Sequence, residues 1–209
     1  MRYYIESDGK LFLVDRSGVL DLPKREEVPF PVEEVAPLGT SEPAVFCVPH
    51  LAGHPHDWLG KDELPGKRLV SKLALEAVHA SMPRVVVEAV CLEEGRLLLV
   101  KGSRGLTEGR WSLPGGFLRF GETPARGVLR EVEEELGVSA QVEGLLDVKA
   151  RQGPKSRLQW VMIFFRVSLQ APVSPNPDEI AEARYFPLAE ANGLLFDELI
   201  REVVAALRE

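Results

Sequence analysis

The sequence predicts an α+β fold in which a small β-rich domain (residues 1–82) precedes a larger domain (residues 83–209). Two observations support this prediction. Apolar residues alternate in several short runs, as in β-strands, and recur at helical spacing in others. The chain also changes character after Pro83, where the strongly apolar run VVVEAV begins. We therefore place the domain boundary near residue 83.

The N-terminal domain opens with a predicted β-meander. The run RYYIESDGKLFLVDRSGVLDLP alternates and has turn signals at Asp8-Gly9 and Ser17-Gly18. A Pro- and Glu-rich stretch without a clear period follows over residues 24–43. Residues 62–82 then contain a predicted helix, RLVSKLALEAVHA, which ends before Met82-Pro83.

The C-terminal domain alternates predicted strands with two predicted helices. VVVEAVCLEEGRLLLVKG reads as two strands joined by a turn at Glu94-Gly95. Further strands are expected at 145–150, at 158–169 and in ARYFPL. The last segment, LLFDELIREVVAALR, has apolar residues at helical spacing and predicts a closing helix.

Composition narrows the class of protein. With 45% hydrophobic and 27% charged residues, the chain of 209 residues is typical of a globular protein with a sizeable core. Its net charge of −7 argues against a nucleic-acid partner. Two cysteines, Cys47 and Cys91, form no disulfide framework, and no signal peptide or membrane-spanning run is evident. We expect a cytoplasmic protein without a membrane partner.

One predicted helix, Pro124–Leu136, has clear signals at both ends. Thr123 suits the N-cap, Pro124 the first helical position and Gly137 the position after the helix. At 100° per residue, one arc of about 100° is apolar and is expected to face the core. It contains Ala125, Val128, Leu129, Val132 and Leu136.

A second arc of the same helix is acidic. Glu131, Glu134 and Glu135 fall within about 100° of one another, with Arg130 beyond Glu134. Such carboxylates repel each other, and the helix dipole disfavours them near the C-terminus. A solvated acidic face is one interpretation. A divalent cation explains the acids together with the preceding glycines, and oxygen ligands favour Mg²⁺ or Mn²⁺.

The same stretch resembles the Nudix box. Residues 116–138 fit Gly-x5-Glu-x7-Arg-Glu-aliphatic-x-Glu-Glu-x-Gly-aliphatic at all nine specified positions. WSLPGG before the box and EARYFPL before the last helix are also similar to Nudix domains, whereas residues 1–82 show no such resemblance. The resemblance implies an α-β-α sandwich with a mixed central sheet for residues 83–209.

The resemblance also implies an activity and roles for individual residues. Nudix enzymes use a divalent metal to hydrolyse a nucleoside diphosphate linked to another moiety. By similarity, Glu134 and Glu135 are metal ligands, Glu131 is a ligand or the base that activates water, and the carbonyl of Gly115 is a further ligand. Arg130 and Glu122 match positions that orient the glutamates, although an ordinary surface salt bridge is the alternative for Arg130.

Residues outside the box are less clearly assigned. Many Nudix enzymes recruit one more acid from the loop before the last strand, for which Glu179 is the first candidate and Glu182 the second. Pro154, sixteen residues after Val138, matches a proline associated with ADP-ribose pyrophosphatases. We therefore favour ADP-ribose or another nucleoside diphosphate sugar, with a nucleoside triphosphate or a CDP-alcohol as the alternative substrate. Four aromatic residues either stack on a base or belong to the core: Trp111, Phe117, Phe120 and Trp160.

The role of residues 1–82 is open between several alternatives. The run CVPHLAGHPHDW contains zinc-type side chains, but their spacing matches no established zinc motif; they are Cys47, His50, His54, His56 and Asp57. Some Nudix-like proteins are nucleotide-sensing transcription regulators with a DNA-binding domain. Residues 1–82 hold 9 Lys and Arg against 13 Asp and Glu, a net charge of −4 that suits DNA poorly. We instead predict a dimerisation or substrate-shaping module in a homodimer.

Overall fold

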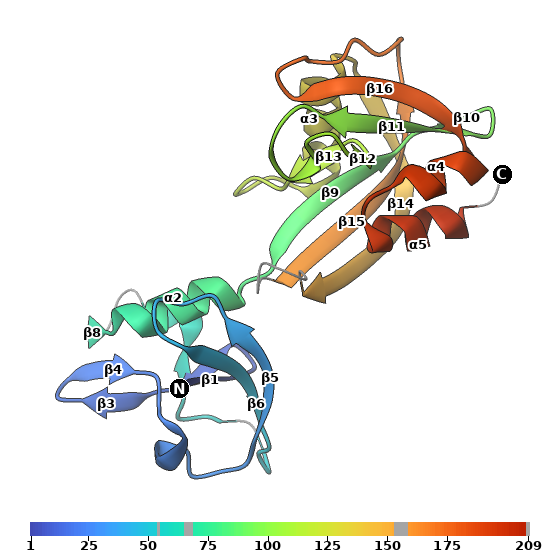
Figure 1. Ribbon diagram of the computed structural model, residues 1–209. Helices are drawn as coiled ribbons and strands as arrows, with labels where there is room; N and C mark the ends of the chain where they lie inside the picture. The colour runs from blue at the N-terminus through green and yellow to red at the C-terminus, as the bar shows by residue number, and fades with distance from the viewer. Residues whose placement is uncertain (54, 65–68, 153–158, 208–209) are drawn as a thin grey trace. The chain divides into compact units, whose positions relative to one another are not determined.

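The computed structural model describes residues 1–53, 55–64, 69–152 and 159–207 (Figure 1). By its internal contacts the chain divides into two compact units. One contains Met1–Pro83 and Arg151–Trp160, and the other contains Arg84–Ala150 and Val161–Glu209. In the described part of the chain, no helix has the length and apolar character needed to cross a membrane.

The described residues of the first unit include two sheets and the helix α2. The larger sheet has the order β5-β6-β1-β2-β7 and the smaller one β3-β4-β8. Helix α2 (Lys72–Ser81) buries Leu73, Ala74 and Ala77 against Tyr4 and Leu11. The strands are β1 Arg2–Ser7, β2 Lys10–Phe12, β3 Val14–Arg16, β4 Val19–Asp21, β5 Val32–Leu38, β6 Ala44–Pro49, β7 Leu59–Gly60 and β8 Leu69–Val70, with 3-10 turns η1 at Arg25–Glu27 and η2 at Lys61–Glu63.

The start of this unit differs from the predicted meander. Both turns form where expected, with positive φ at Asp8 and Ser17. However, the hairpins β1–β2 and β3–β4 lie in different sheets, because β1 pairs in parallel with β6 and β4 pairs in parallel with β8. The helix is also shorter than predicted. Ser71 caps it by accepting a 3.1 Å hydrogen bond from the Ala74 N–H, and Leu69–Val70 before it form β8.

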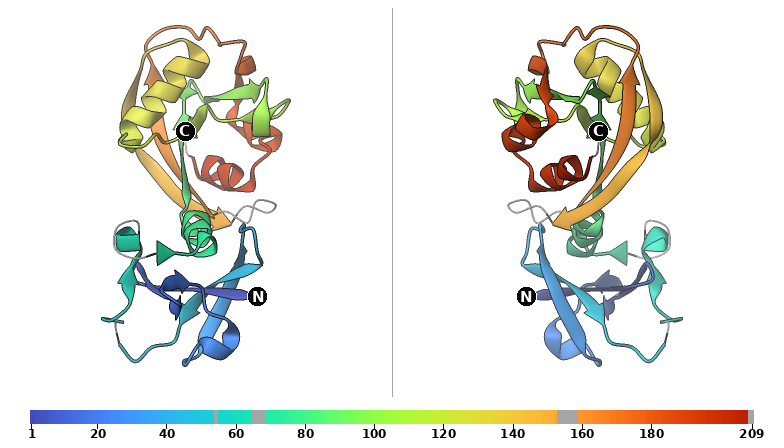
Figure 2. Two further views of the ribbon diagram at one scale, coloured as in Figure 1. Left: turned by 90° about the vertical axis from the view of Figure 1, so that its left-hand side faces the viewer. Right: turned by 90° about the vertical axis from the view of Figure 1, so that its right-hand side faces the viewer.

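The second unit places helices on both sides of its strands. Two sheets have the orders β13-β9-β15-β14 and β10-β11-β12, and β16 pairs with β11. Figure 2 shows α3 on one side of these strands and α4 and α5 on the other. The elements are β9 Arg84–Val90, β10 Leu92–Glu93, β11 Arg96–Gly102, η3 Gly105–Thr107, β12 Trp111–Ser112, β13 Gly115–Phe117, α3 Pro124–Leu136, β14 Ala140–Gln152, β15 Gln159–Leu169, β16 Ile180–Pro187, α4 Leu188–Leu194 and α5 Glu198–Ala206.

The C-terminal segment contains α5, which begins later than the predicted closing helix, and α4, which lies almost wholly before that predicted helix, where no helix was expected. Asp197 separates them, because its carboxylate accepts hydrogen bonds from the N–H groups of Leu199 (2.9 Å) and Ile200 (3.4 Å) and so begins α5. The chain before Asp197 leaves helical geometry at Leu195, the C-cap of α4.

Helix α3 has the predicted bounds, Pro124–Leu136. Its apolar stripe packs on β9 and β11 through Val128, Val132 and Leu136, which are fully buried. Ala125, which was predicted to face the core, is exposed. Gly127 is the buried residue of the first turn, and a Cβ there would lie 2.8 Å from Leu118 Cδ1, so the first turn faces the loop of residues 118–122.

Gly137→Ala is expected to destabilise the protein. Gly137 has φ +61°, and an added Cβ would lie 2.7 Å from the Ser174 carbonyl oxygen. The left-handed backbone alone costs about 1–2 kcal/mol for alanine, and the contact adds to this. Denaturant unfolding followed by circular dichroism measures the loss. Gly193→Ala in α4, where a Cβ meets open space, is the control and is expected to be neutral or stabilising. Equal stability of the two variants would contradict the prediction.

Candidate active site

Two glycines bring β9 and α3 close together. Gly115 and Gly116 in β13 pair with Glu88 and Val87 of β9. A Cβ on Gly115 would lie 2.2 Å from the Val87 carbonyl oxygen, and one on Gly116 would lie 2.7 Å from the carboxylate of Glu131. Any side chain at either position would displace the backbone of β9 or the glutamate. The glycines are therefore required by the close approach of these groups.

Glu135 of α3 contacts the first of these two glycines. Its Oε2 accepts a 3.0 Å hydrogen bond from the Gly115 N–H. Burial is the main reason that the pKa of Glu135 rises to about 8. The Gly115 N–H opposes the shift, whereas the negative charges of Glu131, Glu179 and Glu134 add to it. The site therefore holds this carboxylate in a place where its charge is poorly compensated.

Arg130 joins the remaining acids of the helix and loop. Its Nε and Nη2 bind the carboxylate of Glu122 at 2.8 and 2.9 Å, and its Nη1 binds Glu131 at 2.6 Å and Glu134 at 3.0 Å. Nη2 also donates to the Phe117 carbonyl at 3.0 Å. The Arg130 hydrogen bond, assisted by the backbone N–H of Arg119, lowers the pKa of Glu122 to about 2.

Glu131 and Glu134 differ in their surroundings. Glu131 is buried, and burial raises its pKa although Arg130 opposes this. Glu134 is more exposed, and both of its carboxylate oxygens accept hydrogen bonds from Arg119 Nη2, at 2.9 and 3.1 Å. Arg119 occupies a variable position of the box, so the sequence pattern did not identify it as a partner of Glu134.

The structure adds an acid that the sequence analysis missed. Glu88 lies in β9, is only 6% exposed, and its Oε2 has no hydrogen-bond partner among the described residues. Burial and the negative charges of Glu135, Asp197 and Glu131 raise its pKa well above the ordinary value. The sequence feature that could have identified Glu88 is its position as an ionisable residue in the apolar run VVVEAV. We call Glu88, Glu131, Glu134 and Glu135 the carboxylate cluster.

The two acids predicted outside the box lie in different places. Glu179 directly precedes β16, pairs with Arg104, and its charge contributes to the raised pKa of Glu135. Glu182 is exposed on β16, opposite Lys101 of β11. The charge of Glu179 therefore acts on Glu135, whereas Glu182 faces solvent.

The aromatic residues that were predicted either to stack on a base or to belong to the core differ in how exposed they are. Trp111 packs edge-on against Phe186, with ring centroids 5.0 Å apart, whereas Phe117 is half-exposed and Phe120 is fully exposed. Trp160 is partly buried on β15. Pro154 lies outside the described residues.

Among the described residues of the first unit, the side chains suited to zinc do not form a metal-binding group. Cys47 is fully buried in the core of this unit, and burial raises the pKa of its thiol to about 12. His50, His56 and Asp57 are exposed, and His54 lies outside the described residues. The thiolate that zinc requires is therefore disfavoured at Cys47.

The carboxylate cluster fits a divalent cation chemically. Within the described ranges, no three His, Cys, Asp or Glu side chains are arranged to hold a metal as they stand. In the cluster, Arg130 and Arg119 take oxygens of Glu131 and Glu134. Even so, Glu88 Oε2 is buried with no hydrogen-bond partner among the described residues, and the pKa of Glu135 is raised by burial and then by its acidic neighbours. Hard oxygen donors with uncompensated negative charge are the ligands that Mg²⁺ and Mn²⁺ prefer.

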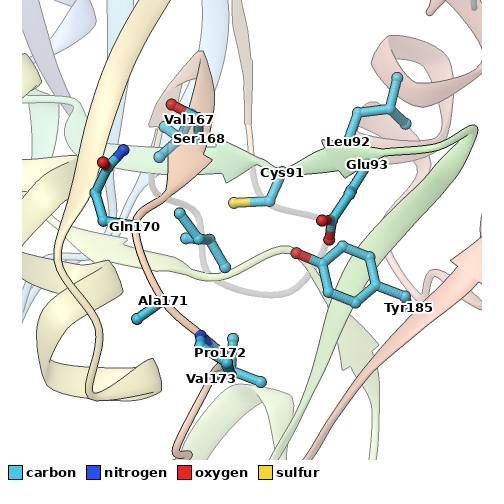
Figure 3. Close-up of a pocket in the computed structure, with 11 residues that line it drawn as sticks. Cys91, Leu92, Glu93, Val167, Ser168, Gln170, Ala171, Pro172, Val173 and Tyr185 are labelled. Carbon is cyan, nitrogen blue, oxygen red and sulfur yellow. The ribbon is translucent and has the colours of Figure 1, made fainter.

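A separate cavity of about 570 Å³ lies elsewhere in the second unit (Figure 3). The thiol of Cys91, the carboxylate of Glu93 and the hydroxyl of Tyr185 line it, together with Gln170 and apolar residues. Burial is the main cause that raises the pKa values of Cys91 and Tyr185 to about 12. No member of the carboxylate cluster is among the described residues that line this cavity.

Comparison with known protein families identifies the second unit. The sequence model of the NUDIX domain matches residues 82–207. The chain belongs to the Nudix family. The predicted fold class is confirmed, with a β-rich region before the Nudix domain.

Individual Nudix proteins are similar to this chain over the same region. An ADP-ribose pyrophosphatase of Methanocaldococcus jannaschii is 30% identical over 63% of this chain and 78% of that protein. The crystal structure of a MutT Nudix hydrolase from Burkholderia pseudomallei matches with a TM-score of 0.54 and 28% identity, over 61% of this chain and all of that one. A UDP-X diphosphatase matches with a TM-score of 0.51 and 29% identity, over 60% of this chain and 62% of that one. The protein is thus a Nudix hydrolase.

Proposed function

We propose that this Nudix hydrolase is a metal-dependent pyrophosphohydrolase that cleaves a nucleoside diphosphate linked to another moiety, releasing a nucleoside monophosphate and the phosphorylated moiety. The observation that carries the proposal is the carboxylate cluster beside Gly115, in which a buried oxygen of Glu88 has no hydrogen-bond partner among the described residues and the pKa of Glu135 is raised. We propose Mg²⁺ or Mn²⁺ as the cofactor because the donors are oxygen atoms.

The residues of the chain have distinct roles in this proposal. Glu134, Glu135 and the carbonyl of Gly115 would hold the cation, and Glu131 would be either a ligand or the base that takes the proton from water. A cation bound there supplies neutralisation of phosphoryl charge and lowers the pKa of water. Arg130 holds Glu131 and Glu134 in place and is itself held by Glu122. Glu179 is the candidate for a further acid or base, since its charge acts on Glu135.

For the substrate we propose ADP-ribose or another nucleoside diphosphate sugar. The support is the similarity to a protein named as an ADP-ribose pyrophosphatase and to one named as a UDP-X diphosphatase. A nucleoside triphosphate or a CDP-alcohol is the alternative. Half-exposed Phe117 directly follows the glycines, exposed Phe120 lies in the loop after it, and both are suited to stacking on a base.

A substrate panel tests this proposal directly. Purified protein with Mg²⁺ is incubated with ADP-ribose, UDP-sugars, CDP-alcohols and nucleoside triphosphates, and the products are separated by chromatography. Release of AMP from ADP-ribose, abolished by a chelator and restored by added Mg²⁺, is the expected result. Cleavage of nucleoside triphosphates alone would overturn the substrate class, and turnover unaffected by the chelator would overturn the metal dependence.

The role of residues 1–82 stays a prediction. We propose that they form an interaction module that shapes the substrate site or joins two copies of the chain. A regulator of transcription is less well supported, because the chain is a Nudix hydrolase by family and its box has every specified position.

A further inference from the structure

Glu88 occupies a position where a carboxylate is costly. It is the fifth residue of β9, and its neighbours in the strand, Val86, Val87, Ala89 and Val90, are all buried and apolar. An ionised side chain in such a place needs a partner, because burial removes it from water. Yet Glu88 Oε2 has no hydrogen-bond partner in the described part of the chain.

The free oxygen of Glu88 lies beside Gly115. Glu88 and Gly115 are paired directly across β9 and β13, so their side-chain directions lie on the same face of the sheet. A Cβ built on Gly115 would lie only 2.9 Å from Glu88 Oε2. Gly115 also donates its N–H to Glu135. Glu88 and Glu135 therefore both lie against one glycine, whose carbonyl is a proposed ligand.

No arginine described in the structure neutralises this part of the cluster. The hydrogen bonds of Arg130 go to Glu122, Glu131, Glu134 and the Phe117 carbonyl, and those of Arg119 go to Glu134 and Glu122. The charges that act on Glu88 are those of Glu135, Asp197 and Glu131, and all are negative. Asp197 already accepts two N–H groups as the N-cap of α5.

We infer that Glu88 is a further ligand of the divalent cation, contributing its unpaired oxygen next to the Gly115 carbonyl. The inference rests on the metal-dependent function proposed above and adds a ligand that lies outside the Nudix box. It explains why a glutamate stands in a strand that is otherwise apolar.

Metal affinity measured without substrate tests this inference. Mn²⁺ binding to the full chain is titrated by electron paramagnetic resonance for the wild type and for Glu88→Gln, Glu88→Asp and Glu133→Gln. Glu133 is exposed on α3 and gives the same change of charge outside the cluster. We expect Glu88→Gln to weaken Mn²⁺ binding about 10-fold or more, and Glu133→Gln to leave it unchanged.

The order of the two Glu88 variants separates a ligand from a residue that only fills space. Glutamine keeps the volume and loses the charge, whereas aspartate keeps the charge and loses a methylene. A ligand role predicts that Glu88→Asp binds Mn²⁺ more tightly than Glu88→Gln. A packing role predicts the reverse order, which would overturn the inference, as would equal affinity of Glu88→Gln and the wild type. Circular dichroism confirms that each variant is folded, and if Glu88→Asp is not, equal affinity of Glu88→Gln and the wild type still overturns the inference.

The same titration distinguishes failure of the inference from failure of the proposed function. Glu135→Gln is included as a variant of a ligand proposed from the box. If the wild type binds no Mn²⁺, the metal-dependent function itself is wrong. If Glu135→Gln loses affinity and Glu88→Gln does not, only the assignment of Glu88 is wrong.

Discussion

Replacing Glu135 by glutamine is expected to lower kcat about 1000-fold or more while the protein remains folded. A metal ligand contributes through charge stabilisation in the transition state, which is worth several kcal/mol, and each 1.36 kcal/mol corresponds to a factor of ten in rate. Glutamine retains an oxygen that accepts the hydrogen bond from the Gly115 N–H. The substitution therefore removes the charge and keeps the main contact of the side chain.

Thermal unfolding without metal provides the control for this variant. The charges of Glu131, Glu179 and Glu134 disfavour ionised Glu135, so loss of its charge is expected to leave the melting temperature unchanged or to raise it. Glu133→Gln on the exposed side of the same helix should retain kcat and shows the effect of charge alone. A kcat near that of the wild type in Glu135→Gln would remove Glu135 from the proposed ligands.

The parts of the fold that were predicted correctly depend on local signals. Thr123, Pro124 and Gly137 act on the backbone within one or two turns, and the bounds of α3 followed from them. The hairpin turns at Asp8 and Ser17 are local in the same sense. The sheet to which each hairpin belongs is decided by parallel partners later in the chain, β6 and β8, and no local pattern specifies that pairing.

In the candidate site, too, contacts within one helix were predictable from the sequence, whereas contacts between separate elements were not. The arc of Glu131, Glu134 and Glu135 follows from helical geometry, so their proximity was predictable. Glu88 was not predicted because its relation to Gly115 depends on the register between β9 and β13. Arg119 was missed because only the folded loop brings it to Glu134. Side chains that meet across elements required the structure.

Arg130→Lys is expected to lower kcat about 10- to 100-fold with little change in KM, because the substitution affects the alignment of the ligands and not their identity. The guanidinium of Arg130 makes five hydrogen bonds, to Glu122, Glu131, Glu134 and the Phe117 carbonyl, from one planar group. Lysine keeps the positive charge but has three donors on a single nitrogen and cannot span these partners.

Steady-state kinetics on the best substrate of the panel, compared with Arg126→Lys, tests this role of Arg130. Arg126 is exposed on the same helix and bonds Thr123 only through its backbone N–H, so its replacement should change neither kcat nor stability. Loss of the Phe117 and Glu122 contacts in Arg130→Lys should also lower the melting temperature, since these bonds hold the glycine loop to α3. An increase in KM at constant kcat would instead assign Arg130 to substrate binding. Unchanged kinetics would mean that Glu131 and Glu134 are positioned without Arg130.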